Sequence, residues 1–85
     1  MAKKKFSYYI GVLMNDGKIK FVTSINVCNK SARWESGKQA LDFSMAEADS
    51  IVFGLLMNFH YAFTVKVPYG IEFFNPAESE ENVNE

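Results

Sequence analysis

Two side chains in this sequence could act together as a nucleophile and its base: the single thiol, Cys28, and the single imidazole, His60. Such a pair needs hydrogen-bond reach between the two groups and an electropositive setting that favours the thiolate. Cys28 follows a predicted strand and His60 follows a predicted helix, so the fold could bring them together. No glycine motif that could form an oxyanion hole accompanies them. We therefore expect no catalytic residues and no enzymatic activity.

Metal and nucleotide chemistry find even less support. One cysteine and one histidine fall short of the usual four-ligand zinc site. The five glycines are scattered, and neither a P-loop nor a G-x-G-x-x-G motif can be drawn through them. Glu47 and Asp49 lie where a predicted helix begins, and negative charge is favoured there for structural reasons. We expect no cofactor, no metal and no small-molecule substrate.

The composition is that of one small globular domain. The chain has 85 residues, 48% hydrophobic and 22% charged, with a formal net charge of −1. We divide it into a basic N-terminal arm (1–5) with Lys3–Lys5, a single α+β domain (6–75) and a disordered acidic tail (76–85). Charges balance between residues 6 and 77, so the folded part has no global attraction for nucleic acid or anionic lipid.

The expected cellular compartment is inferred from segments that could direct export or span a membrane. The longest unbroken apolar run, Ile51–Met57, is far shorter than the roughly 20 residues of a bilayer span. No apolar segment of signal-peptide length follows the lysines near the start. A single cysteine also forms no disulfide within the chain. We expect a cytoplasmic protein without membrane contact.

A β-hairpin is predicted first. Residues 6–14 are rich in aromatic and β-branched types, residues 15–17 (Asn-Asp-Gly) fit a tight turn, and residues 18–27 alternate. We expect the face with Phe21 to pack on a core, on the same side as Phe6 and Ile10. The opposite alternation then carries an apolar patch on the second face, made of Tyr9, Leu13 and Val22.

A helix and a closing strand follow a polar segment (29–37), which we interpret as a loop or a ragged strand. We interpret Gln39–Phe43 as a short third strand, although an extension of the following helix also fits its spacing. Ser44 and Glu47 fit a capping box, and Asn58 is a plausible terminator. The helical arc expected to face the sheet contains Met45, Ala48, Val52, Leu55, Leu56 and Phe59, with Ile51 at its margin.

The last strand is predicted at Tyr61–Val67, where alternation returns before Pro68 ends it. Residues 69–74 extend the sheet or lie along its edge. The order β-β-β-α-β predicts an α+β fold in which one amphipathic helix packs on a small antiparallel or mixed sheet.

Several residues at fixed places in this order support a resemblance. They are Trp34 in the loop, the A-x-x-F-S segment from Ala40 to Ser44, Glu47 and Ala48 in the first helical turn, and the closing V-x-V of Val65 to Val67. The succession resembles small accessory proteins encoded by phages and mobile elements of Gram-positive bacteria. The resemblance implies a compact α+β accessory protein, and some small phage proteins of this size bind and inhibit host defence proteins. It carries over no functional residue.

The apolar content exceeds what one helix on one sheet can cover. Phe53 and Met57 fall outside the core-facing arc, and the patch around Tyr9 lies on the second face of the sheet. Such a surplus predicts an interaction surface that a second copy or another protein covers. Alternatively, Lys20 or residues 69–74 cover it. We expect a homodimer that binds a protein partner and acts by steric occlusion. The expected partner-binding residues are Phe53, Met57, Tyr9, Trp34 and Arg33.

A nucleic-acid-binding accessory protein is the second hypothesis. Lys30, Arg33 and Lys38 surround Trp34, and this combination, with Lys3–Lys5, could contact phosphates while the indole stacks on a base. The competing interpretation places the Trp34 ring beneath the loop as part of the core. We favour core packing, so we expect nucleic acid to be an unlikely partner.

Overall fold

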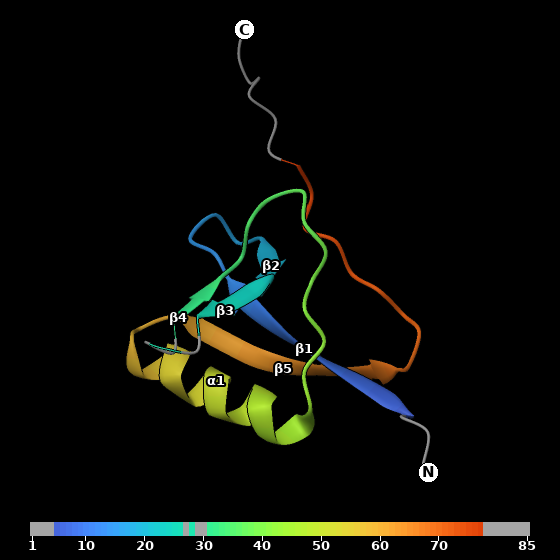
Figure 1. The fold of residues 1–85 in the computed structure, drawn as a ribbon. Coiled ribbons are helices and arrows are strands. Elements are labelled where there is room, and N and C mark those ends of the chain that lie inside the picture. The colour runs from blue at the N-terminus through green and yellow to red at the C-terminus, as the bar shows by residue number, and fades with distance from the viewer. Residues whose placement is uncertain (1–4, 27, 29–30, 78–85) are drawn as a thin grey trace, which may run out of the picture.

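A computed structural model describes residues 5–26, 28 and 31–77 (Figure 1). The elements are β1 (Phe6–Leu13), β2 (Ile19–Phe21), β3 (Ser24–Asn26), β4 (Ser31–Arg33), α1 (Met45–Met57) and β5 (Tyr61–Pro68). The predicted α+β class is confirmed. The basic arm and the acidic tail lie outside the described residues, apart from Lys5, Pro76 and Ala77.

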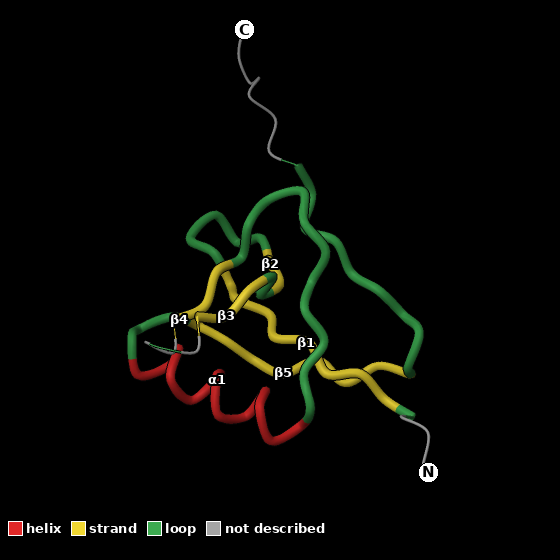
Figure 2. The backbone as a smooth tube through the Cα atoms, viewed as in Figure 1, coloured by secondary structure: helices red, strands yellow, loops and turns green. Residues whose placement is uncertain are grey.

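Two antiparallel sheets form the β layer (Figure 2). The larger sheet has the order β2-β1-β5, and β1 at its centre pairs along its whole length with β5, from Phe6 opposite Pro68 to Leu13 opposite Tyr61. The smaller sheet joins β3 to β4. Helix α1 packs against β5 and β1 on one face of the larger sheet.

The turn between β1 and β2 fixes how these strands face each other. Met14 donates its N–H to the Lys18 carbonyl at 2.8 Å, and the Gly17 N–H donates to the Met14 carbonyl at 3.0 Å. Gly17 has a φ of 87°, which glycine adopts without steric cost. The loop enclosed by the pair of Met14 and Lys18 therefore contains three residues, and the predicted turn is confirmed.

This loop places Gly11 opposite Phe21, so the predicted facing of the hairpin was wrong. Phe21 shares a face with Tyr9, whereas Val22 donates to the Ile10 carbonyl at 2.9 Å and is fully buried in the core with Ile10. Because side chains alternate along a strand, a register that differs by one residue moves every side chain to the other face. The apolar patch predicted from Tyr9, Leu13 and Val22 is therefore divided between two faces.

The predicted strand at residues 18–27 and the predicted third strand also differ from the structure. The first is split after Phe21, and β3 turns away to pair with β4, in the segment expected to be a loop or a ragged strand. Gln39–Phe43 forms no strand: the N–H groups of Ala40, Leu41 and Phe43 donate to carbonyls on three different segments, at Phe73, Val22 and Tyr8. Such divided bonding leaves two isolated bridges in place of a ladder.

Helix α1 begins and ends where the sequence predicts. Ser44 Oγ accepts the Glu47 N–H at 3.2 Å, and Glu47 Oε1 accepts the Ser44 N–H at 3.1 Å, which completes the capping box. Asn58 is the C-terminal cap. The inward arc is narrower than expected, because Ala48 and Leu55 are buried whereas Met45, Leu56 and Phe59 are exposed.

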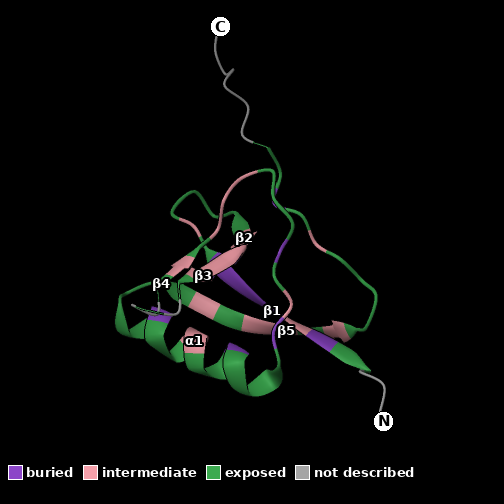
Figure 3. Cartoon of the chain, in the orientation of Figure 1, coloured by how far each residue is buried: buried purple, intermediate pink, exposed green. Residues whose placement is uncertain are grey.

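The core lies between α1 and the larger sheet. Figure 3 shows the buried residues concentrated on β1 and on the inner side of α1. Its members are Ile10, Val12, Val22, Phe43, Ala48 and Leu55. Across the described residues, no helix has the length and apolar content that a bilayer crossing requires.

Residues 69–77 form a strap over the opposite face of the sheet. Phe73 stacks on Phe21 with a centroid distance of 4.7 Å and meets the Tyr9 ring edge-on at 5.0 Å. The Tyr9 hydroxyl donates to the Ile71 carbonyl at 2.7 Å. Covering of this face by residues 69–74 was one of the alternatives that the sequence allowed.

Asn75 anchors the end of this strap. Its side chain is buried, accepts the Phe21 N–H at 2.7 Å and donates to the Phe21 carbonyl at 2.7 Å. A further bond reaches the Glu35 carbonyl at 3.2 Å. The amide group therefore pairs with β2 as a neighbouring strand would.

Candidate interaction surface

The structure places the five predicted partner-binding residues in different environments. Phe53 and Met57 lie on the outer side of α1 and are 67% and 66% exposed. Arg33 is exposed at the end of β4. Tyr9 is only 3% exposed beneath the strap, so its assignment to a surface was wrong. Trp34 is half-buried and packs against the core.

The surroundings of Trp34 agree with the interpretation that places its ring in the core. Its ring meets the His60 ring edge-on, with centroids 5.3 Å apart and planes at 73°. Lys38 is exposed, and Lys3, Lys4 and Lys30 lie outside the described residues. Because the indole already contacts His60 and the core, it is poorly placed to stack on a base.

The potential nucleophile and base do not form a described pair. Cys28 is an exposed free thiol, and the one described ring contact of His60 is with Trp34. No hydrogen bond between Cys28 and His60 occurs in the described part of the chain. Among the same residues, no group of three or more histidine, cysteine or acidic side chains could hold a metal ion.

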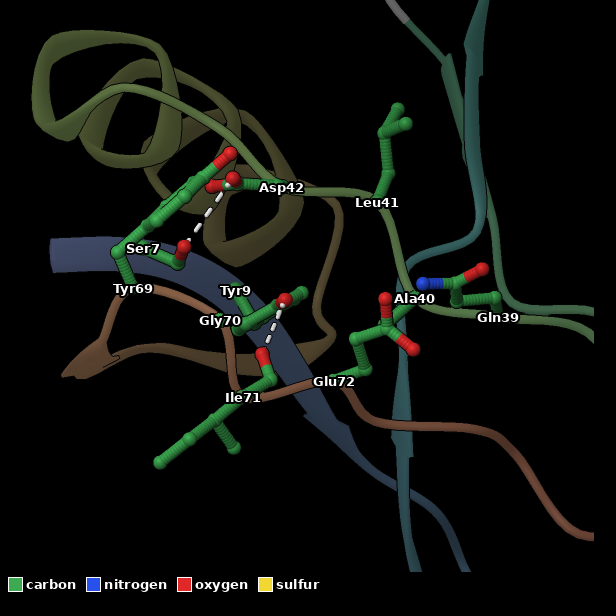
Figure 4. A pocket seen from close by; sticks show the side chains of 10 residues that line it. All are labelled: Ser7, Tyr9, Gln39, Ala40, Leu41, Asp42, Tyr69, Gly70, Ile71 and Glu72. Carbon is green, nitrogen blue, oxygen red and sulfur yellow. Dashed lines mark hydrogen bonds between the residues drawn. The ribbon is translucent and has the colours of Figure 1, made fainter. Parts of the chain in front are cut away.

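A hollow of about 400 Å³ lies between β1, residues 39–42 and the strap (Figure 4). At its wall the buried Ser7 hydroxyl donates to Asp42 Oδ2 at 3.1 Å, and the Tyr8 N–H donates to Asp42 Oδ1 at 3.3 Å. No histidine lines this hollow, so Ser7 has no imidazole base there. These two hydrogen bonds hold the segment before α1 against β1. Ser7 and Asp42 therefore have a structural role.

The outer helix surface, which we define as Phe53, Met57 and Phe59, is the most exposed apolar feature of α1 and its C-terminal end. Phe53 and Met57 are four residues apart and therefore share one side of the helix. Phe59, two residues beyond the last helical residue, is 97% exposed. The sequence had assigned Phe59 to the core, because its spacing continues the helical period.

The backbone at Phe59 explains this error. The Phe59 N–H donates to the Leu56 carbonyl at 3.1 Å, and the His60 N–H donates to the Leu55 carbonyl at 3.0 Å. These two bonds are those of a Schellman motif, whose left-handed position is usually glycine. Phe59 occupies that position with a φ of 66°. The sequence did not indicate this motif, because no glycine follows Asn58.

Comparisons of this chain with protein-family models, curated proteins and solved structures found no match.

Proposed function

We propose that this protein is a non-enzymatic protein-interaction module that binds and occludes a protein partner through the outer helix surface. The observation that carries the proposal is Phe59, a large aromatic side chain 97% exposed on a left-handed backbone. That conformation costs a non-glycine residue about 1–2 kcal/mol, and the exposed ring recovers none of it by packing within the described chain. Insertion of the Phe59 ring into a partner would bury it and offset the cost of the left-handed backbone.

The charges of α1 define the chemistry of the partner. Glu47 and Asp49 are its only charged residues, and both are exposed. Glu47 is held in the capping box, whereas Asp49 lies one turn before Phe53 on the same side of α1. An apolar surface beside this carboxylate complements an apolar cleft with lysine or arginine at its rim. Steric occlusion of such a cleft needs no catalytic group. A host defence protein is the class of target that we propose for an accessory protein of phage or mobile-element type.

The test compares matched variants as immobilised baits. A protein retained by the wild-type chain is purified, and its affinity is measured for Met57→Ser, Phe59→Ala and the control Phe74→Ser. Phe74 is 61% exposed, but it belongs to the strap. We expect binding to weaken at least tenfold for the two helix-surface variants and to persist for the control. Equal binding by all variants, or by none including wild type, would contradict the proposal.

A further inference from the structure

Strand β5 has an open edge on the side away from β1. The carbonyls of Tyr8 and Ile10 accept from Phe43 and Val22, on the other side of β1. In an antiparallel ladder, opposite residues both turn their backbone groups toward each other or both turn them away. The partners of Tyr8 and Ile10 are Lys66 and Thr64. Their backbone N–H and C=O groups therefore point outward.

Ala62, opposite Val12, shares this outward orientation because it is two residues from Thr64. Among the described residues, no strand pairs with this edge, and no hydrogen bond is made by the backbone of Ala62, Thr64 or Lys66. An unpaired edge of this kind is a template for another strand.

The usual protection of an edge is confined to one end of β5. Lys66 places its ammonium 4.2 Å from the centre of the Phe6 ring, and Pro68 ends the strand. Charged residues and proline discourage pairing. The first five residues of β5, Tyr61–Val65, contain neither, and they consist mostly of aromatic and β-branched types.

Exposed apolar side chains also lie on the flank of α1 above this edge, beside the carboxylate of Asp49. Helix α1 runs antiparallel to β5, with Ala48 and Leu55 against the sheet. Since a right-handed helix turns by about 100° per residue, Met45 and Leu56 project on the side of the open edge of β5. They are 58% and 47% exposed. One edge thus combines unpaired backbone groups with exposed apolar side chains.

We infer that this edge pairs with the same edge of a second copy of the chain, antiparallel and about a two-fold axis at Phe63. In this register Ala62 and Thr64 exchange backbone hydrogen bonds with Thr64 and Ala62 of the second copy. Phe63 lies opposite its own equivalent, and Tyr61 lies opposite Val65. Lys66 remains outside the paired segment.

A second copy is the occupant because the edge is self-complementary. The two-fold axis brings the flank with Met45 and Leu56 against the same flank of the other helix, so apolar groups meet apolar groups on one face of the joined sheet. On the other face, Tyr61 of each copy meets Val65 of the other, while each Phe63 ring leans back over Gly11 of its own sheet. The inference goes beyond the proposed function, because it concerns the edge of β5, whereas Met57 lies on the side of α1 opposite Ala48 and stays free in this dimer.

Two proline substitutions test the edge, with mass measured by sedimentation velocity from low to high micromolar concentration. Thr64→Pro removes an outward N–H, so we expect a folded monomer of 9.7 kDa where wild type gives twice that mass. Val65→Pro removes an N–H that faces β1, so we expect its melting temperature to fall far more. A wild-type chain that stays monomeric, or a dimer that persists in folded Thr64→Pro, would overturn the inference.

Cross-linking tests the register without relying on proline. In a Cys28→Ser background, Phe63→Cys should form a disulfide-linked dimer under mild oxidation, because the two sulfurs would face each other at a pair without hydrogen bonds. Asp16→Cys, in the exposed hairpin turn, should remain monomeric. Equal cross-linking at both positions, or none at Phe63→Cys, would refute this register. Phe59→Ala should leave the dimer intact, so the inference and the proposed function fail separately.

Discussion

The ring of Phe63 on β5 lies against the backbone of Gly11, its cross-strand partner on β1. A Cβ atom at Gly11 would lie 2.6 Å from Phe63 Cζ, so any larger residue must displace the ring. Glycine in a strand commonly marks such a close approach. This contact joins β1, the central strand of the sheet, to β5, its edge strand.

Gly11→Ala should therefore destabilise the fold by about 1–3 kcal/mol, the usual cost of overpacking a filled site. Urea unfolding measures the change. The control is Gly54→Ala, since a Cβ at this position in α1 meets no atom within 4 Å. We expect that variant to be more stable than wild type by up to about 1 kcal/mol. A neutral effect of Gly11→Ala would mean that the ring moves aside freely.

Asn75→Ala should be among the most damaging substitutions in the strap. It removes three side-chain hydrogen bonds and leaves the Phe21 N–H and carbonyl without this partner. We expect a loss of about 2–4 kcal/mol in the free energy of unfolding, because buried polar groups lose their bonds. Asn58→Ala is the matched control, since its exposed amide donates a single bond to the Gly54 carbonyl. Similar losses for both variants would refute the role of Asn75.

Position 59 separates backbone strain from side-chain function. Phe59→Gly should raise the free energy of unfolding by about 1 kcal/mol, because glycine adopts the left-handed conformation without a Cβ penalty. Phe59→Ala keeps the penalty and removes the ring, so we expect stability near that of wild type. Both variants should lose partner binding. If Phe59→Gly and Phe59→Ala were equally stable, the strain argument would fail.

Ser44→Ala should lower stability by about 1 kcal/mol through loss of the helix cap. The Glu47 N–H would lose its acceptor, and Glu47 would lose its hydrogen bond with the Ser44 hydroxyl. Ser50→Ala, at an exposed position within α1, should leave the melting temperature unchanged or slightly higher. Thermal unfolding followed by circular dichroism distinguishes the two.

Local signals in the sequence predicted the parts of the fold that depend on neighbouring residues. Asn15-Asp16-Gly17 marked the turn, the pair of Ser44 and Glu47 marked the helix start, and the alternation after Tyr61 marked the last strand. Each signal works because the hydrogen bonds or side-chain contacts that it reflects lie within a few residues of one another.

Other features depend on segments that are distant in the sequence. The burial of Tyr9 requires Phe73, and the end of β2 is completed by the Asn75 side chain. Nothing near Tyr9 in the sequence indicates that a strap will return to cover it. Of the candidate site, Phe53 and Met57 followed from helical spacing, whereas Phe59 did not, because the period alone does not show where the helical path stops.

The central position of β1 has a consequence for the order of folding. Its contacts with β2 form across a short turn, but its long ladder with β5 joins Phe6 to Pro68 and Leu13 to Tyr61. During synthesis, one side of β1 stays unpaired until the chain has been made as far as β5. Contacts of such large sequence separation slow folding, and they leave the first strand available to other strands in the meantime.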